Sequence, residues 1–186
     1  MANANLADNE TQAHLDIPIR CQSLVRVINP EDRFCLARAI LIGLKWFLTF
    51  EQNGSSAEFK TYCANQAMHG PDARQLLLDA GISISLSIYG IQEVQQIQQH
   101  LLQRFGTKRI RLVIFSSDGQ QQQQQQYQFK LIWKGWDDGA AETNICLLHH
   151  RNHFSFIGKP SQLFKAIIFK IFNSTKHSIL VSWLLH

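Results

Sequence analysis

The spacing of apolar residues changes once along this chain. In the first part, apolar positions recur every three or four residues, which is typical of helices that bury one face. From residue 109 onward, the apolar runs are short and rich in β-branched residues, as in strands. Helices followed by strands predict an α+β fold. The expected helices are Cys35–Phe50, Ala57–Met68, Pro71–Ala80 and Ile91–Phe105, and the expected strands are Arg109–Phe115, Tyr127–Trp133, Asn144–His149 and His153–Ile157.

Local signals set the ends of several of these elements. Glu31 and Asp32 precede the first helix, and Gly81 follows the third at the position where glycine ends helices. The helix that begins at Cys35 is apolar nearly all round, which predicts a place at the centre of the domain. Arg151 and Asn152 form a tight turn between the last two strands. The strands are therefore expected to form an antiparallel sheet on which the helices pack.

Segments outside this pattern are expected to lie outside the core. Residues 1–14 form a polar tail, and residues 15–160 form one domain. A run of glutamines interrupts the strands and predicts an extruded loop near 118–128. Residues 161–186 form an apolar C-terminal tail, interpreted as a product of truncation or read-through. Lysines divide that tail into pieces too short to span a bilayer, so no integral membrane span is expected.

Composition narrows the class of protein. The chain has 186 residues, 45% of them hydrophobic and 17% charged, which supports a packed core. A formal net charge of +4 allows only weak association with DNA. The four cysteines lie far apart, with no spacing typical of metal sites, so neither a metal nor a cofactor is expected. Free thiols and a polar N-terminus indicate an intracellular location, cytoplasmic or nuclear.

Cys35 is the first candidate for chemistry. It stands where a helix begins, and the positive end of the helix dipole stabilises a thiolate there. The thiolate is the nucleophilic form of cysteine. The alternative is a small apolar residue that fills the first turn of a core helix, because free cysteine is among the most buried residue types.

A nucleophilic cysteine needs a base within hydrogen-bond reach, and that base can lie far away in sequence. Eight histidines are available, and three of them cluster at the last predicted hairpin. Of these three, His153 begins a strand that places its side chain on one face with Ser155 and Ile157. The alternative for His153 is a polar residue of the turn.

The segment Asp32–Ile40 resembles a family signature. It reads Asp-Arg-Phe-Cys-Leu-Ala-Arg-Ala-Ile, and it is similar to the Asp-Gly-Asn-Cys-Leu-Phe-Arg-Ala-Ile motif of OTU cysteine proteases, which are papain-like deubiquitinases. Tyr89–Gln95 resembles the stretch before the central helix of that family, where Gly-Gly-x-x-Glu-Leu is usual. Asn144–Leu148 and the pair His153-Phe154 are similar to its last hairpin.

The resemblance implies a papain-like fold and a catalytic triad. Cys35 would be the nucleophile, His153 the general base and Asp32 the acid that orients the histidine. Backbone N–H groups of the Asp32–Cys35 turn would form the oxyanion hole. The implied substrate is a ubiquitin-like protein or a polyprotein.

A second resemblance concerns the origin of the chain. The pattern Asn-Pro-x-Asp-x-x-Cys-Leu-x-Arg-Ala-Ile, with Tyr-Gly-Ile and a final Asn-His-Phe, is similar to the region that precedes the DNA polymerase in Maverick/Polinton-type mobile elements and related insect viral genes. This resemblance implies a peptidase-like domain derived from a mobile element or virus.

Two further functions stay open. Arg33 and Phe34 replace the Gly-Asn of the family signature, and that glycine normally shapes the oxyanion turn. The first alternative is therefore a catalytically inactive interaction module of the same fold. The second is an accessory part of a mobile-element DNA polymerase or replication protein.

Overall fold

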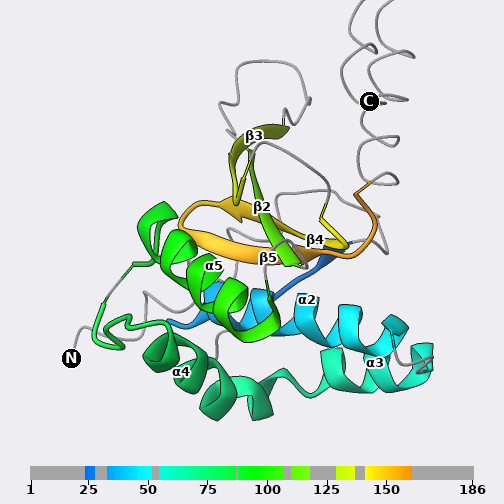
Figure 1. Cartoon of the computed structure of the whole chain (residues 1–186). Coiled ribbons are helices and arrows are strands. Elements are labelled where there is room, and N and C mark those ends of the chain that lie inside the picture. Colours follow the sequence, from blue (N-terminus) through cyan, green and yellow to red (C-terminus); the bar gives the residue numbers. More distant parts are fainter. Residues whose placement is uncertain are drawn as a thin grey trace, which may run out of the picture.

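The computed structural model describes residues 24–27, 33–51, 55–86, 88–106, 110–117, 129–136 and 141–160. Within these ranges the chain is α+β, with helices in the first part and strands mainly in the second (Figure 1). The helical elements are α2 (Cys35–Glu51), α3 (Ser56–Ala64), a 3-10 helix η1 (Gln66–His69), α4 (Gly70–Asp79) and α5 (Ile91–Phe105). The strands are β1 (Leu24–Val25), β2 (Ile110–Ser117), β3 (Phe129–Lys134), β4 (Thr143–His150) and β5 (His153–Ile157).

The five strands form one mixed sheet in the order β1-β5-β4-β2-β3. Three of the four neighbouring pairs are antiparallel, whereas β2 and β4 run parallel, with Ile114 opposite Leu147. The prediction of an antiparallel sheet was therefore wrong in this detail. After β2, the chain forms β3 antiparallel to β2 along one of its edges. It then reverses direction again and forms β4 along the other edge of β2, so β4 runs parallel to β2.

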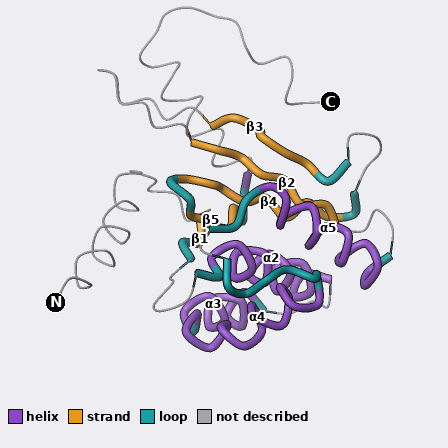
Figure 2. Tube along the Cα trace, turned by 90° about the vertical axis from the view of Figure 1, so that its left-hand side faces the viewer, coloured by secondary structure: helices purple, strands orange, loops and turns teal. Residues whose placement is uncertain are grey.

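The helices gather on one side of the sheet, as Figure 2 shows for α2, α3 and α4. Alternating residues of the strands face this helical layer and form the main core with α2, α4 and α5. The residues between them form a smaller apolar cluster on the opposite face, made of Val113, Cys146, Leu148 and Ile157. Helix α2 lies at the centre of the main core, because every side chain from Cys35 to Ile40 is buried. This confirms the placement of that helix.

Several element boundaries follow local rules. Gly81 has φ of +72°, and its N–H donates to the Leu78 carbonyl, which confirms it as the end of α4. Gly90 precedes α5, and its N–H donates to the Glu93 carboxylate (2.6 Å), which is the half of a capping box that a glycine can form. The expected helix at 57–68 is divided at Asn65, where α3 ends and η1 begins.

Some expectations lie outside the described residues. These are the tail 1–14, Asp32, the loop near 118–128 and the C-terminal tail 161–186. In the part of the chain that the structure describes, none of the helices is long and apolar enough to cross a membrane.

Gly43 is the point where α2 comes closest to the sheet. A Cβ atom there would lie 2.4 Å from the Cγ2 atom of Ile145 and 3.2 Å from the ring of Phe156. Gly43→Ala is expected to lower the free energy of unfolding by about 1–3 kcal/mol through overpacking, despite the better helix propensity of alanine. Urea denaturation measures this loss. The double variant Gly43→Ala/Ile145→Ala should be less destabilised than the sum of its single changes, and strict additivity would contradict the contact.

Candidate active site

Cys35 is the first residue of α2. The helix makes its first intrahelical bond from the Arg38 N–H to the Phe34 carbonyl (2.9 Å). The thiol therefore lies at the positive end of a 17-residue helix, where an anion is favoured. The residue is buried, with an exposed fraction of 6%. Its position fits both the nucleophile and the alternative of a core residue.

The turn between β4 and β5 brings a distant part of the chain to Cys35. Arg151 and Asn152 have φ of 47° and 62°, which is the two-residue hairpin turn expected from the sequence. The Cys35 Sγ lies 4.0 Å from the Asn152 carbonyl oxygen, to which the thiol donates weakly. Asn152 immediately precedes His153. The structure thus brings Cys35 to the turn that carries the predicted base, across 117 positions of sequence.

His153 is half-buried at the start of β5, and its ring is fixed by a backbone group. Its Nε2 lies 3.0 Å from the Val27 carbonyl oxygen. A carbonyl only accepts, so Nε2 must carry the proton, and in the neutral ring Nδ1 then holds the lone pair. Nδ1 is therefore the atom that could act as a base. Sequence reasoning missed Val27, because a main-chain carbonyl gives no signal in a side-chain pattern.

Gln66 holds the segment that carries this carbonyl. Its side-chain Nε2 donates to the Arg26 carbonyl (2.7 Å), one residue before Val27. The backbone carbonyl of Gln66 in turn accepts a bond from the guanidinium of Arg38, which is buried on α2. A chain of contacts therefore connects the helix of Cys35 to the group that orients His153. The sequence predicted neither the burial of Arg38 nor the role of Gln66.

The other two histidines of the hairpin make different contacts. The His149 ring packs on Phe154, with 4.7 Å between ring centroids. His150 Nδ1 lies 2.6 Å from the Ser117 hydroxyl, on the neighbouring strand β2. Of the three, His153 alone follows directly on the residue that Cys35 contacts.

Arg33 and Phe34 are the described residues of the turn before Cys35, and they replace the Gly-Asn of the signature that the segment resembles. Among the described residues, the non-glycine positions with positive φ are Arg151 and Asn152. Arg33 and Phe34 therefore do not require the left-handed conformation that favours glycine. Asp32, the predicted orienting acid, lies outside the described residues.

Burial keeps two other thiols in their neutral form. It raises the pKa of Cys63 to about 11 and the pKa of Cys146 to about 12. Both groups carry little thiolate at neutral pH, so both are poor nucleophiles. They therefore provide internal controls for experiments on Cys35.

A titratable cluster lies behind α2, where α3, η1 and α4 meet. His69 stacks on Tyr62, with ring centroids 4.0 Å apart, and its Nε2 donates to the Tyr62 carbonyl (3.1 Å). Its Nδ1 is buried and has no hydrogen-bond partner among the residues that the structure describes. Burial lowers the pKa of His69, against the hydrogen bond to the Tyr62 carbonyl, which raises it. The charge of Arg38 lowers this pKa further, and the charge of Asp72 raises it. The cluster therefore favours neutral His69.

This shift predicts acid sensitivity. Because the pKa of His69 is lower in the folded state than in the unfolded chain, its contribution to stability is present above the ordinary value of 6.5 and is lost as the pH falls below it. One such group changes the free energy of unfolding by at most about 1.4 kcal/mol per pH unit. Urea denaturation from about pH 7 to about pH 5 should show a smaller loss for His69→Gln than for the unchanged protein. Equal losses would contradict the prediction.

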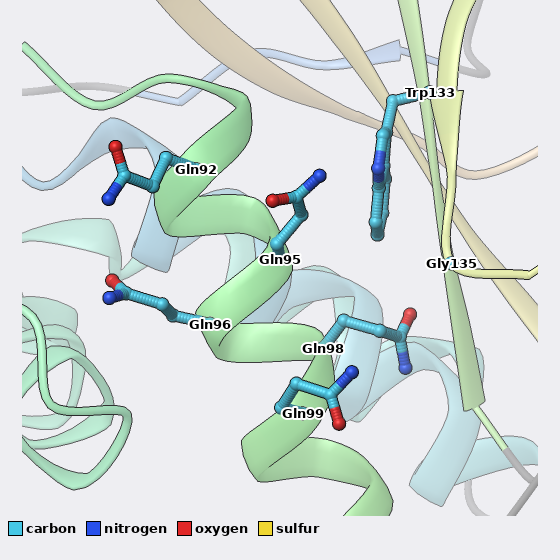
Figure 3. Close-up of a pocket in the computed structure, with 7 residues that line it drawn as sticks. All are labelled: Gln92, Gln95, Gln96, Gln98, Gln99, Trp133 and Gly135. Atoms are coloured by element: carbon cyan, nitrogen blue, oxygen red, sulfur yellow. The ribbon is translucent and has the colours of Figure 1, made fainter.

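Two hollows lie on the described surface. One, of about 480 Å³, is lined by α5 glutamines, Trp133 and Gly135 and contains no residue of α2 (Figure 3). The other, of about 550 Å³, is bordered by Phe34, the residue before Cys35. Among the described residues, no three His, Cys, Asp or Glu side chains lie together in a group that could hold a metal ion.

Comparisons with protein-family models, with curated proteins and with solved structures gave no match for this chain.

Proposed function

We propose that this chain is an OTU-like cysteine peptidase domain that attacks a peptide or isopeptide carbonyl. The observation that carries the proposal is the contact between Cys35, at the start of α2, and Asn152, the residue before His153. A thiol at a helix N-terminus, a histidine with a fixed ring and a third group that orients it are the parts that thiol hydrolysis needs. The resemblance of Asp32–Ile40 to the OTU signature names the substrate class: a ubiquitin-like protein or a polyprotein, in an intracellular setting.

The reaction begins with deprotonation of Cys35. In the resting arrangement the thiol faces the Asn152 carbonyl, so it must turn toward the ring of the following residue. Nδ1 of His153 then takes the proton, and the sulfur forms a bond to the carbonyl carbon of the substrate. The Val27 carbonyl stabilises the resulting imidazolium through Nε2.

The second half of the reaction releases both products. The tetrahedral intermediate collapses as the C–N bond breaks, and the imidazolium gives its proton to the leaving amine. Water then attacks the thioester while Nδ1 accepts a proton from it. The C–S bond breaks, the substrate leaves as a carboxylic acid, and the thiol of Cys35 is restored.

A ubiquitin derivative with a C-terminal vinyl sulfone tests the proposal. The full chain is expected to form a covalent adduct on Cys35, identified by peptide mass spectrometry, and Cys35→Ala should form none. Cys63→Ser should form the adduct as well as the unchanged protein does, because that thiol is held neutral by burial. Adduct formation that persists in Cys35→Ala would contradict the assignment of the nucleophile, and a complete absence of adduct would contradict the deubiquitinase.

The mobile-element origin belongs to the same proposal, since it concerns the source of the domain rather than its chemistry. An inactive interaction module would use the same fold without the thiol, and it predicts no Cys35-dependent adduct.

A further inference from the structure

The hollow of about 550 Å³ lies against the first residues of the candidate active site. Phe34 borders it from one side, and the start and outer face of α4 border it from the other. Its lining residues are Phe34, Gly70, Pro71, Arg74, Gln75 and Leu78. Phe34 directly precedes Cys35 in the chain, so the hollow lies near the start of α2, and Cys35 itself does not line it.

The walls of the hollow combine apolar surface with one charge. Phe34, Pro71 and Leu78 supply the apolar part, and Leu78 is 48% exposed although it is a large aliphatic side chain. Together these three side chains give the hollow an apolar wall beside its charged group.

Arg74 is the charged group of the hollow. It lies exposed on α4, and the described lining residues include no acidic side chain. Gln75, the polar neighbour of Arg74, donates its amide to the Asp79 carboxylate (2.6 Å), so that carboxylate already has a partner on its own helix. Among the described lining residues, the Arg74 guanidinium is therefore the one charged group, and it is complementary to a carboxylate.

From these contacts we propose that the hollow between Phe34 and α4 is a substrate subsite for a peptide segment with an acidic residue beside an apolar one. The apolar side chain covers Leu78 and Pro71, and the carboxylate pairs with Arg74. This inference rests on the proposed function for its meaning as a subsite, whereas the binding itself does not require catalysis.

Binding is measured on the full chain carrying Cys35→Ala, so that no turnover interferes. The probe is the fluorescein-labelled hexapeptide Leu-Asp-Leu-Asp-Leu-Asp, and the matched control is the same peptide with asparagine at each acidic position. Fluorescence anisotropy should show tighter binding of the acidic peptide. The added change Arg74→Gln should weaken that binding by about fivefold, the size expected for an exposed ion pair. Raising NaCl from about 50 mM to about 500 mM should reduce the same preference.

Arg104→Gln, which changes an exposed arginine on α5, is the control for a general effect of charge. Equal binding of the acidic and neutral peptides, or equal weakening by Arg74→Gln and Arg104→Gln, would overturn the subsite. Preferential binding without any adduct of the ubiquitin probe would retain a binding site for acidic peptides and refute the deubiquitinase. An adduct on Cys35 without a preference for the acidic peptide would support the deubiquitinase and refute the peptide site.

Discussion

Cys35→Ala should reduce the hydrolysis of a fluorogenic ubiquitin C-terminal amide by about 10⁶-fold, the effect of removing a catalytic nucleophile. No other described thiol can replace it, since burial raises the pKa of Cys63 to about 11 and that of Cys146 to about 12. His153→Gln should lower kcat/KM by about 10²–10⁴-fold, because glutamine neither accepts the thiol proton nor protonates the leaving amine.

Matched variants separate chemistry from folding. Cys63→Ser and His149→Gln change the same residue types and leave the Cys35–Asn152 contact in place. Circular dichroism should show unchanged helix content for all four variants. If His149→Gln lost as much activity as His153→Gln, the assignment of the base would be wrong.

Gln98→Leu should have the largest effect on stability among the glutamines of α5. Gln98 accepts from the Leu112 N–H (2.7 Å) and donates to the Ile110 carbonyl (2.9 Å), both on β2. β3 pairs with β2 only from Val113 onward, so this side-chain amide bonds the edge of β2 where the neighbouring strand is missing. Leucine leaves two buried backbone groups unpaired, and each such group costs about 1–3 kcal/mol.

Urea denaturation of Gln98→Leu and Gln99→Leu tests this account. Figure 3 shows both side chains on α5, with Gln98 directed toward Gly135, the residue that follows β3. Gln99 is exposed, so its change should alter the free energy of unfolding by less than about 0.5 kcal/mol. Similar losses in the two variants would show that the bonds to β2 contribute nothing.

The spacing of apolar residues predicted the helices well, because a helix forms through contacts between residues that are close in sequence. Expected and observed bounds agree for Ile91–Phe105 and for the strand His153–Ile157. The parallel pairing of β2 with β4 could not be predicted in this way, since it depends on which strand edge the chain meets after β3. Gln98 shows the same limit within one helix: six glutamines occupy α5, and nothing local distinguishes the one that bonds to the sheet.

For the candidate site, the sequence predicted the two reactive side chains but not the contacts that hold them. Residue type and helix position pointed to Cys35, and the hairpin pattern pointed to His153. The support for His153 comes instead from the Val27 carbonyl and from Gln66, which holds the neighbouring Arg26 carbonyl. These contacts connect segments about forty to more than a hundred positions apart. Because every residue has a main-chain carbonyl, the sequence does not indicate which one accepts such a bond.

The rate of Cys35 carbamidomethylation by iodoacetamide, measured near neutral pH by peptide mass spectrometry, tests the pairing of Cys35 with His153 most directly. The account predicts faster labelling of Cys35 than of Cys63 or Cys146, and a clear fall in the Cys35 rate in His153→Gln. The same rate at Cys35 in both proteins would contradict the pairing.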